Sequence, residues 1–337
     1  MLKSVSAIAN ACARRYRALL LVPFVVVVAM VATKTHAQID KAKALRIIVP
    51  LAAGSTTDVV ARLIADRIKT DLGRSVIIDN RPGATGRIAV DALKSASPDG
   101  TTLLLAPIAV PVIVPLVFAN VNFDPARDLV PISQIATFEF ALAVAPDHPA
   151  RSLPEFIAWA GANRLRATYG TAGVGSMAHL LGTMLAKAAN IELAHVPYKS
   201  SATMEAEVMG GQIAATFTLL SEVAALHRAG KLRILATSGA LRSHLAPDVH
   251  TFREDGFPAA EAIGWHALYA PARTPQAVID RLASEISTAV RSTDVQTRMV
   301  ALGLTPTGTT PNELSAIMAT DIAYWRGIIR TSGYTAE

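Results

Sequence analysis

The sequence is almost without cysteine, because Cys12 is the one thiol among its 337 residues. A single thiol this close to the N-terminus excludes an internal disulfide and gives no support to a thiolate metal site or a cysteine nucleophile. Cys12 also precedes the long apolar run of the N-terminus, whereas a lipid-bearing cysteine follows such a run. If this segment is removed on export, the rest of the chain has no thiol, which suits an oxidising compartment.

Acidic residues are absent from residues 1–37, which contain five basic residues. Three arginines precede an apolar run over residues 19–32, and Thr35-His36-Ala37 ends the segment with the small residues that a signal peptidase reads. We predict a signal peptide cleaved near Ala37. The alternative is a retained membrane anchor, but the apolar run is shorter than the roughly 20 residues that a span needs. Arg14-Arg15 raises twin-arginine export, although no Leu or Phe pair follows at once.

A second long apolar run is also missing, so we predict no transmembrane helix after residue 37. The formal net charge of +6 loses five basic residues with the signal peptide, which leaves 27 Lys and Arg against 26 Asp and Glu. This near-neutral balance gives no support to nucleic-acid binding, which requires a basic patch on the domain itself. The remaining chain is long for one core and comfortable for two.

Motifs of catalysis and metal binding are missing as well. The sequence contains neither a Gly-x-Ser-x-Gly nucleophile elbow nor a His-Glu-x-x-His zinc motif. Its eight histidines do not cluster at the spacing of metal ligands. We therefore predict no catalytic residue, no metal site and no cofactor.

Short apolar runs alternate with amphipathic helical patterns, and the series starts twice along the chain. The first series predicts strands over 45–49, 75–79 and 101–105 and helices over 58–72 and 86–95. The second predicts strands over 138–144, 165–169, 191–197, 212–218 and 232–237 and helices over 153–163, 176–189, 201–209 and 222–229. An apolar stretch over 265–270 and helices over 275–290, 295–302 and 312–329 follow. Two such series predict an α/β protein with two doubly wound lobes.

Two strand-to-helix turns carry glycine and hydroxyl side chains where a helix begins. Their residues are Ala53, Gly54, Ser55, Thr56, Thr57 and Asp58 in the first turn and Thr171, Ala172, Gly173, Val174, Gly175 and Ser176 in the second. A helix N-terminus has unpaired N–H groups and a partial positive charge, and glycine lets a ligand approach the backbone. Each turn could therefore hold an anion without a basic side chain. The alternative is a pair of ordinary N-caps, and residue chemistry alone leaves the two interpretations about equal.

The second turn also fits a dinucleotide fingerprint, Gly173-Val174-Gly175-Ser176-Met177-Ala178, with Glu192 further on. This motif is weak in isolation, and an export signal counts against it because dinucleotide cofactors are scarce outside the cytoplasm. A dinucleotide-binding oxidoreductase is nevertheless the enzyme alternative. We interpret His179, one turn into the following helix, as packing or capping support rather than as a ligand contact.

A larger set of motifs runs in order along the chain. It includes Ile47-Ile48-Val49-Pro50, Asn80-Arg81-Pro82-Gly83-Ala84, Pro98-Asp99-Gly100-Thr101-Thr102, Phe123-Asp124-Pro125, Tyr169-Gly170-Thr171-Ala172-Gly173-Val174-Gly175-Ser176, His195-Val196-Pro197-Tyr198-Lys199 and Gly256-Phe257-Pro258. From about Arg46 to Gly333, the chain resembles the substrate-binding receptors of tripartite tricarboxylate transporters, the Bug or TctC-like proteins.

The resemblance implies the fold of a type II periplasmic binding protein, with two lobes joined by two crossing strands. Lobe 1 would comprise residues 38–139 and 263–337, and lobe 2 would comprise residues 140–262. A small carboxylate would be held by N–H groups and hydroxyls of the two turns, at the twelve residues named above. The partners implied are permease subunits of a secondary transporter or a sensor protein, and we expect a periplasmic monomer that binds no nucleic acid.

Several positions depart from the family pattern. Leu51 stands where the family usually has an aromatic residue, and Ser55 stands in place of a second glycine. Ala214 and Thr218 occupy positions where acids are frequent, and residues 107–111 are apolar where hydroxyls are common. We therefore expect a ligand with an apolar or aromatic body, or else altered binding.

Overall fold

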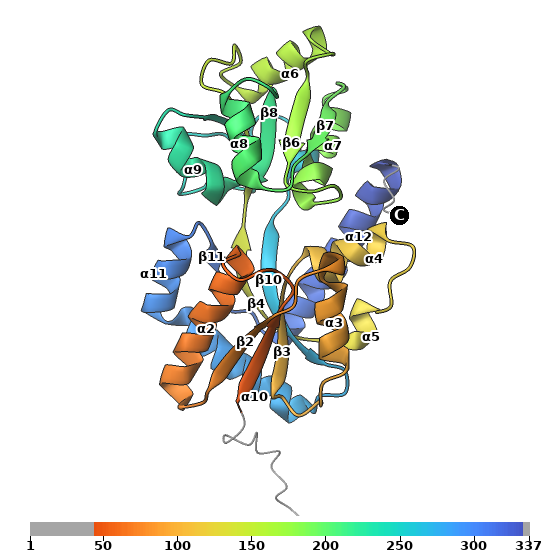
Figure 1. Ribbon diagram of the computed structural model, residues 1–337, viewed down its shortest axis with the longest axis vertical. Helices are drawn as coiled ribbons and strands as arrows, with labels where there is room; N and C mark the ends of the chain where they lie inside the picture. Colours follow the sequence, from red (N-terminus) through yellow and green to blue (C-terminus); the bar gives the residue numbers. More distant parts are fainter. Residues whose placement is uncertain (1–43, 333–337) are drawn as a thin grey trace, which may run out of the picture. The chain divides into compact units, whose positions relative to one another are not determined.

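The computed structural model describes residues 44–332 of the chain, and Figure 1 shows its ribbon. The predicted signal peptide, residues 1–37, and its cleavage site lie outside these residues. Within them, two β-sheets are each packed against helices. The chain passes from one sheet to the other between Phe138 and Phe140 and returns at Gly264.

The first sheet has the strand order β11-β4-β10-β3-β1-β2. Its strands are β1 (Leu45–Val49), β2 (Val76–Asn80), β3 (Thr102–Pro107), β4 (Leu129–Phe138), β10 (Gly264–Pro271) and β11 (Thr305–Pro306). β1 is parallel to β2 and β3, whereas β10 is antiparallel to both β3 and β4. The long antiparallel pair of β4 and β10 therefore fills the centre of this sheet and leads toward the other one (Figure 1).

The second sheet has the strand order β7-β6-β8-β5-β9. Its strands are β5 (Phe140–Val144), β6 (Thr168–Thr171), β7 (Ala194–Pro197), β8 (Ala215–Leu219) and β9 (Arg233–Thr237). β6 is parallel to β7 and β8, and β5 runs antiparallel to β8 and β9. The carboxyl ends of β6 and β8 consequently share one edge of the sheet.

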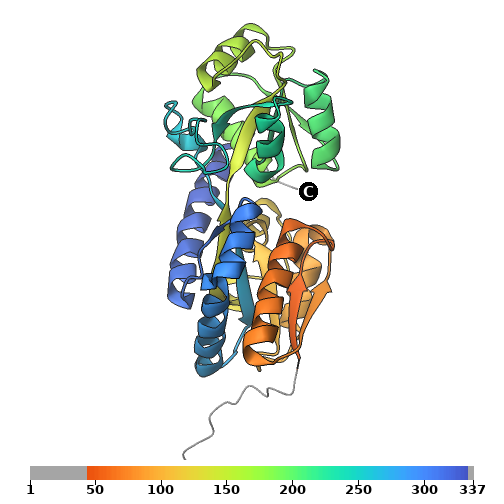
Figure 2. The same cartoon turned by 90° about the vertical axis from the view of Figure 1, so that its left-hand side faces the viewer.

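Helices follow the strands in the alternation that the sequence predicts. Those that follow strands of the first sheet or close the chain are α2 (Thr56–Leu72), α3 (Arg87–Lys94), α4 (Val114–Val117), α5 (Pro125–Asp128), α10 (Gln276–Arg291), α11 (Thr293–Ala301) and α12 (Pro311–Ser332). Those of the second part are α6 (Leu153–Ala162), α7 (Met177–Ala188), α8 (Ser201–Met209) and α9 (Leu220–Arg228). Short helical turns cover Ala84–Gly86, Ala109–Ile113 and Pro258–Ala260. α2 packs beside α10, as Figure 2 shows from the side.

The main hydrophobic core is continuous between the two sheets. It contains Ile48 and Trp265 from the first sheet, Phe140 and Phe217 from the second, and Trp325 from α12. α12 contacts β4 and α7, so its apolar face packs against both parts. A smaller cluster around Ala141, Met204 and Val223 supports the outer face of the second sheet.

Most local predictions are confirmed by the structure. α8 spans Ser201–Met209 as predicted, Ser152 caps α6, and Gly73 ends α2 in a left-handed conformation with φ 62. In the part of the chain that the structure describes, no helix has the length and apolar character of a membrane span.

Several predicted strands are wrong in their limits, since β6, β7 and β8 each begin three residues later than predicted and β4 was not predicted. No strand was predicted before Phe138, whereas the ten residues Leu129–Phe138 form β4. The sequence of β4 is not typical of a central strand, because it contains Pro131 and the buried polar residues Ser133 and Gln134. In the structure, β4 accommodates these residues because its register against β10 is interrupted by bulges. The N–H of Gln134 also donates to Oγ1 of Thr309 at 2.8 Å. The strand predicted from Leu165 begins instead at Thr168, since Leu165 is fully exposed in a turn.

Candidate functional site

Loop 1, residues 53–58, connects β1 to α2 and begins the helix with a side-chain cap. Ser55 is the N-cap, and its Oγ accepts the N–H of Asp58 at 3.3 Å. Gly54 precedes it at φ 84, a conformation that favours glycine. Among the described residues, the N–H groups of Thr56 and Thr57 have no protein acceptor, as expected for the first turn of a helix. Loop 1 therefore presents unpaired backbone donors.

Asp58 holds loop 1 in place from inside. Its buried carboxylate accepts the Gly54 N–H at 2.9 Å, Nδ2 of Asn80 at 2.9 Å and two bonds from Arg62 at 2.9 and 3.0 Å. Burial acts to raise the pKa of Asp58, but these hydrogen bonds and the charge of Arg62 hold that pKa below its usual value. The carboxylate is thus ionised and fully occupied, and we assign it to positioning the loop.

Thr57 lies in loop 1 but turns its side chain inward. Its Oγ1 is 3.0 Å from Nε2 of His266, and both residues are buried. Burial lowers the pKa of His266 to about 4, so the imidazole is neutral near pH 7. His266 lies on β10 beside Phe138, with ring centroids 4.9 Å apart. This contact ties the start of α2 to the strands that lead between the sheets.

Loop 2, residues 171–176, connects β6 to α7 and repeats the capping arrangement. Ser176 is the N-cap; its Oγ accepts the His179 N–H at 3.2 Å and donates to the Gly173 carbonyl at 3.0 Å. Gly173 and Gly175 have φ values of 110 and 73. Within the described chain, the N–H groups of Met177 and Ala178 at the start of α7 have no protein acceptor. Loop 2 therefore has unpaired backbone donors, as loop 1 does.

Two histidines support loop 2 from behind. Nδ1 of His179 accepts the Gly175 N–H at 3.0 Å, and Nε2 of His195 lies 2.7 Å from Oγ1 of the buried Thr171. The two rings stack with centroids 4.0 Å apart. Burial lowers the pKa of both histidines, and the neighbouring His179 helps to lower that of His195 to about 4. His179 thus acts as capping support, as its position in the sequence suggested.

The loops open on two neighbouring pockets. The cleft pocket, of about 250 Å³, includes Ala172, Ser176, Met177 and Ala178 at the start of α7 and also receives residues of the first sheet. Its other lining residues are Pro107, Ile108, Ala109, Phe138, Phe140, Ser201, Phe217, Thr218, Leu219 and Glu222. The rim pocket, of about 390 Å³, includes Gly54 and Thr56 of loop 1 together with Glu222. Glu222 is therefore common to both pockets.

The predicted site residues separate into four groups. Gly54, Thr56, Ala172 and Ser176 line the pockets. Thr57, Asp58 and Thr171 are buried and bond to other parts of the protein, whereas Ala53 and Val174 are exposed. Ser55 caps α2, and Gly173 and Gly175 shape loop 2. Phe138, Phe140, Phe217 and Glu222 also line the cleft pocket and were not predicted as site residues. The available signal for Glu222 was an acid four residues after Thr218, at the end of a predicted strand.

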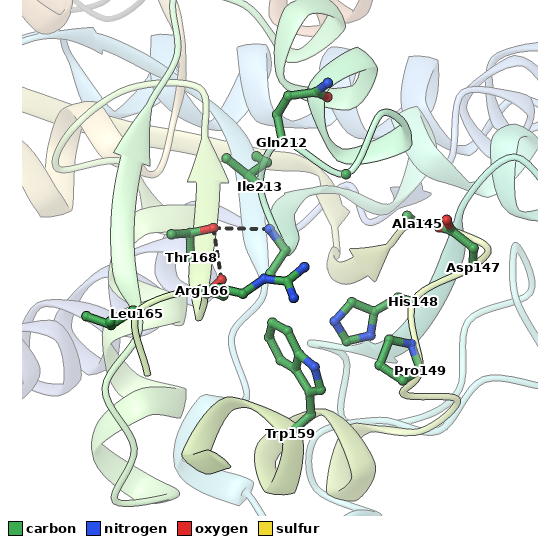
Figure 3. Close-up of a pocket in the computed structure, with 12 residues that line it drawn as sticks. Ala145, Asp147, His148, Pro149, Trp159, Leu165, Arg166, Thr168, Gln212 and Ile213 are labelled. Atoms are coloured by element: carbon green, nitrogen blue, oxygen red, sulfur yellow. Dashed lines mark hydrogen bonds between the residues drawn. The ribbon is translucent and has the colours of Figure 1, made fainter. Parts of the chain in front are cut away.

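A further pocket of about 360 Å³ lies at the opposite edge of the second sheet (Figure 3). It is bordered by the end of β5 and the starts of β6 and β8, with Trp159, His148 and Arg166 around it. The His148 and Trp159 rings meet edge to face at 4.5 Å. Neither loop contributes to this pocket, so it is separate from the candidate site. Among residues 44–332, no group of three His, Cys, Asp or Glu side chains could hold a metal ion.

The comparisons with known proteins agree with this geometry. Residues 60–334 match the Tripartite tricarboxylate transporter family receptor. The chain belongs to this family. BugT of Bordetella pertussis is 32% identical to it over 318 residues, which cover 94% of this chain and 98% of BugT. The predicted family is thereby confirmed.

Two solved structures share the fold. R. palustris Rpa4515 with adipate has a TM-score of 0.77 and 30% identity, covering 87% of this chain and 98% of that one. MatC from Rhodopseudomonas palustris with bound malate has a TM-score of 0.74 and 26% identity, covering 86% and 99%. The predicted type II periplasmic binding protein fold is confirmed, and these matches give the dinucleotide alternative at Gly173 no support.

Proposed function

We propose that the protein is a non-enzymatic periplasmic receptor that binds a small carboxylate between its two lobes. The observation that carries this proposal is the pair of Ser-capped helix starts, each of which presents unpaired N–H groups beside a pocket. Such helix starts attract anions through the N–H groups and the helix dipole. The ligands named for relatives, adipate and malate, are carboxylates, which selects this anion among those that the loops could hold.

The predicted contacts divide between holding the ligand and shaping the loops. The N–H groups of Thr56, Thr57, Met177 and Ala178 are the donors that a carboxylate would reach, with Ala53, Gly54, Ala172 and Gly173 providing close backbone approach. Ser55, Val174, Gly175 and Ser176 complete the two loops. Asp58 and Thr171 act through the backbone that they hold, since their side chains already have protein partners.

Closure of the two lobes over the ligand would couple binding to transport. We place the lobe boundaries at residues 139 and 263, where the chain passes between the sheets, with residues 38–139 and 263–337 in lobe 1 and 140–262 in lobe 2. A ligand that contacts both lobes favours the closed form. The receptor, exported as a monomer after cleavage near Ala37, would then deliver its ligand to membrane permease subunits; a sensor protein is the other partner that fits.

A thermal-shift screen of purified residues 38–337 tests the proposal. Carboxylates such as adipate and malate are compared with neutral sugars at equal concentration. A bound ligand at a hundred times its Kd stabilises the folded state by about 2.7 kcal/mol, so a binder raises the melting temperature clearly. Stabilisation by sugars with none by any acid would refute the carboxylate assignment.

A further inference from the structure

The cleft pocket carries a charge of the wrong sign for a second carboxylate. Of the described residues that line it, Glu222 is the one with a formal charge, and the remaining walls are largely apolar. Phe138 at the end of β4, Phe140 at the start of β5 and Phe217 on β8 bring aromatic rings to it. A ligand carboxylate held at the start of α7 therefore has an aromatic cavity and one acidic side chain beside it.

Glu222 is held in position rather than left to rotate. The hydroxyl of Thr218, which is buried at the end of β8, donates to Oε2 of Glu222 four residues further on. Glu222 itself is exposed toward the pockets, so its carboxylate is accessible to a ligand. Because the buried Thr218 hydroxyl bonds to it, the accessible carboxylate of Glu222 has a fixed orientation.

No basic side chain neutralises Glu222 inside the cleft pocket among the residues that the structure describes there. Arg228 lines the rim pocket, but it lies six residues further along α9, and its Nε donates to the Ala224 carbonyl. Glu205 on α8 is a second acid near Glu222, and burial together with the charge of Glu222 raises the pKa of Glu205 to about 7. The surroundings of Glu222 thus favour a cation or a hydrogen-bond donor.

We propose that Glu222, held by Thr218, selects a carboxylate ligand whose aromatic or apolar body carries an ammonium group and disfavours a second carboxylate. This inference rests on the proposed carboxylate function and narrows its ligand class. The ligand's carboxylate binds the unpaired N–H groups, its body fills the cavity between Phe138, Phe140 and Phe217, and its ammonium group meets Glu222. A dicarboxylate of the same size places like charges together.

Two matched ligand series test the inference by calorimetric titration of residues 38–337. The first consists of p-(aminomethyl)benzoate, p-toluate and terephthalate, which differ only at the end opposite the carboxylate. The second consists of phenylalanine, phenylpropanoate and benzylsuccinate, in which the varied group lies beside the carboxylate. In at least one series we expect the ammonium ligand to bind at least about tenfold more tightly than either companion.

Variants assign the preference to Glu222. Glu222→Gln should remove the ammonium preference while leaving the affinity for the uncharged companion within about twofold, and Thr218→Val should weaken the preference partly. Glu192→Gln, an exposed glutamate outside the pockets, should change nothing. Thermal unfolding of each variant verifies that it is folded.

Two kinds of outcome would overturn the inference, and only the second would also refute the proposed carboxylate function. Equal or tighter binding of the dicarboxylate in both series, or an unchanged preference in Glu222→Gln, refutes the role of Glu222 but leaves a carboxylate receptor. Absence of binding by all six ligands together with adipate and malate refutes the inference and the proposed function at once.

Discussion

The N–H of Gly175 donates to Nδ1 of His179 across 3.0 Å, at the point where α7 begins. In loop 1, the N–H of Gly54 donates to Oδ2 of Asp58 across 2.9 Å. In both loops, a serine N-cap follows the glycine, and the residue three positions after the cap reaches back to that glycine. The two lobes thus use one backbone arrangement with a carboxylate in one case and an imidazole in the other.

His179 should therefore influence ligand binding without contacting the ligand. In His179→Ala the Gly175 N–H loses its acceptor, and we expect a loss of stability of about 1 kcal/mol, typical of one hydrogen bond. Because loop 2 also loses its defined shape, affinity for the ligand should fall about tenfold. His244→Ala, which alters an exposed histidine, is the control for calorimetry and urea unfolding. Equal affinities in the two variants would contradict the positioning role.

Two serine caps of the second lobe, Ser176 and Ser152, allow an effect on stability to be separated from an effect on binding. Ser176→Ala and Ser152→Ala each remove an N-cap oxygen, from α7 and α6 respectively. Each should cost about 1 kcal/mol of unfolding free energy. Only Ser176→Ala should also weaken the binding of a carboxylate, because α6 starts far from the pockets of the two loops. If Ser152→Ala weakens binding as much, the effect arises from global stability and not from loop 2.

A glycine pair offers the same comparison in the first lobe. Gly54 and Gly73 have φ values of 84 and 62, and an added Cβ would meet no atom within 4 Å at either position. Replacing either by alanine should therefore cost only backbone strain, about 1 to 2 kcal/mol. Gly54→Ala should in addition reduce ligand affinity, since Gly54 lines the rim pocket and the substitution strains the backbone of loop 1. Unchanged affinity in Gly54→Ala would show that loop 1 is not a contact.

Glu139, where the chain passes between the sheets, should make the stability of the fold depend on pH. Burial raises the pKa of Glu139 to about 7, and its buried Oε2 has no partner within the described residues. A raised folded-state pKa gives stability that is complete below the unfolded pKa of about 4.5 and is lost as pH rises through about 7. The Glu139→Gln side chain stays neutral at every pH. The unfolding free energy of this variant, relative to that of the wild type, should therefore be about 2 kcal/mol higher at pH 8 than at pH 4.5.

Urea unfolding at both pH values measures this difference. Comparison with the wild type cancels the opposite contribution of His266, whose lowered pKa makes stability increase with pH. A difference between variant and wild type that is constant with pH would mean that Glu139 ionises normally in the folded protein.

Much of the fold was predictable because its signals are local. The apolar runs at 45–49 and 232–237 and the amphipathic pattern of α2 determine their own secondary structure. Likewise Ser152 and Gly73 act on neighbouring backbone groups, so their capping roles follow from the sequence. β4 was not predictable, since Ser133 and Gln134 are tolerated there only through pairing with β10 and the distant Thr309.

The site was predictable in its backbone but not in its side chains. Gly54 and Ser176 indicate that a helix begins at each position. The resemblance to receptors of tripartite tricarboxylate transporters implied that both helix starts face one cleft. The sequence could not show that Thr57 turns inward, because its partner His266 lies 209 residues away. Nor could it show that Phe138 and Phe217 meet at one pocket, since that depends on how the two sheets are joined.

The most direct test of the central claim compares acids with their own amides. Calorimetric titration of residues 38–337 with adipate, malate and p-toluate, each paired with its neutral amide, isolates the contribution of the carboxylate charge. The unpaired N–H groups of the two helix starts predict saturable binding of at least one acid and binding of its amide at least about a hundredfold weaker. An amide that binds as tightly as its acid would contradict the account.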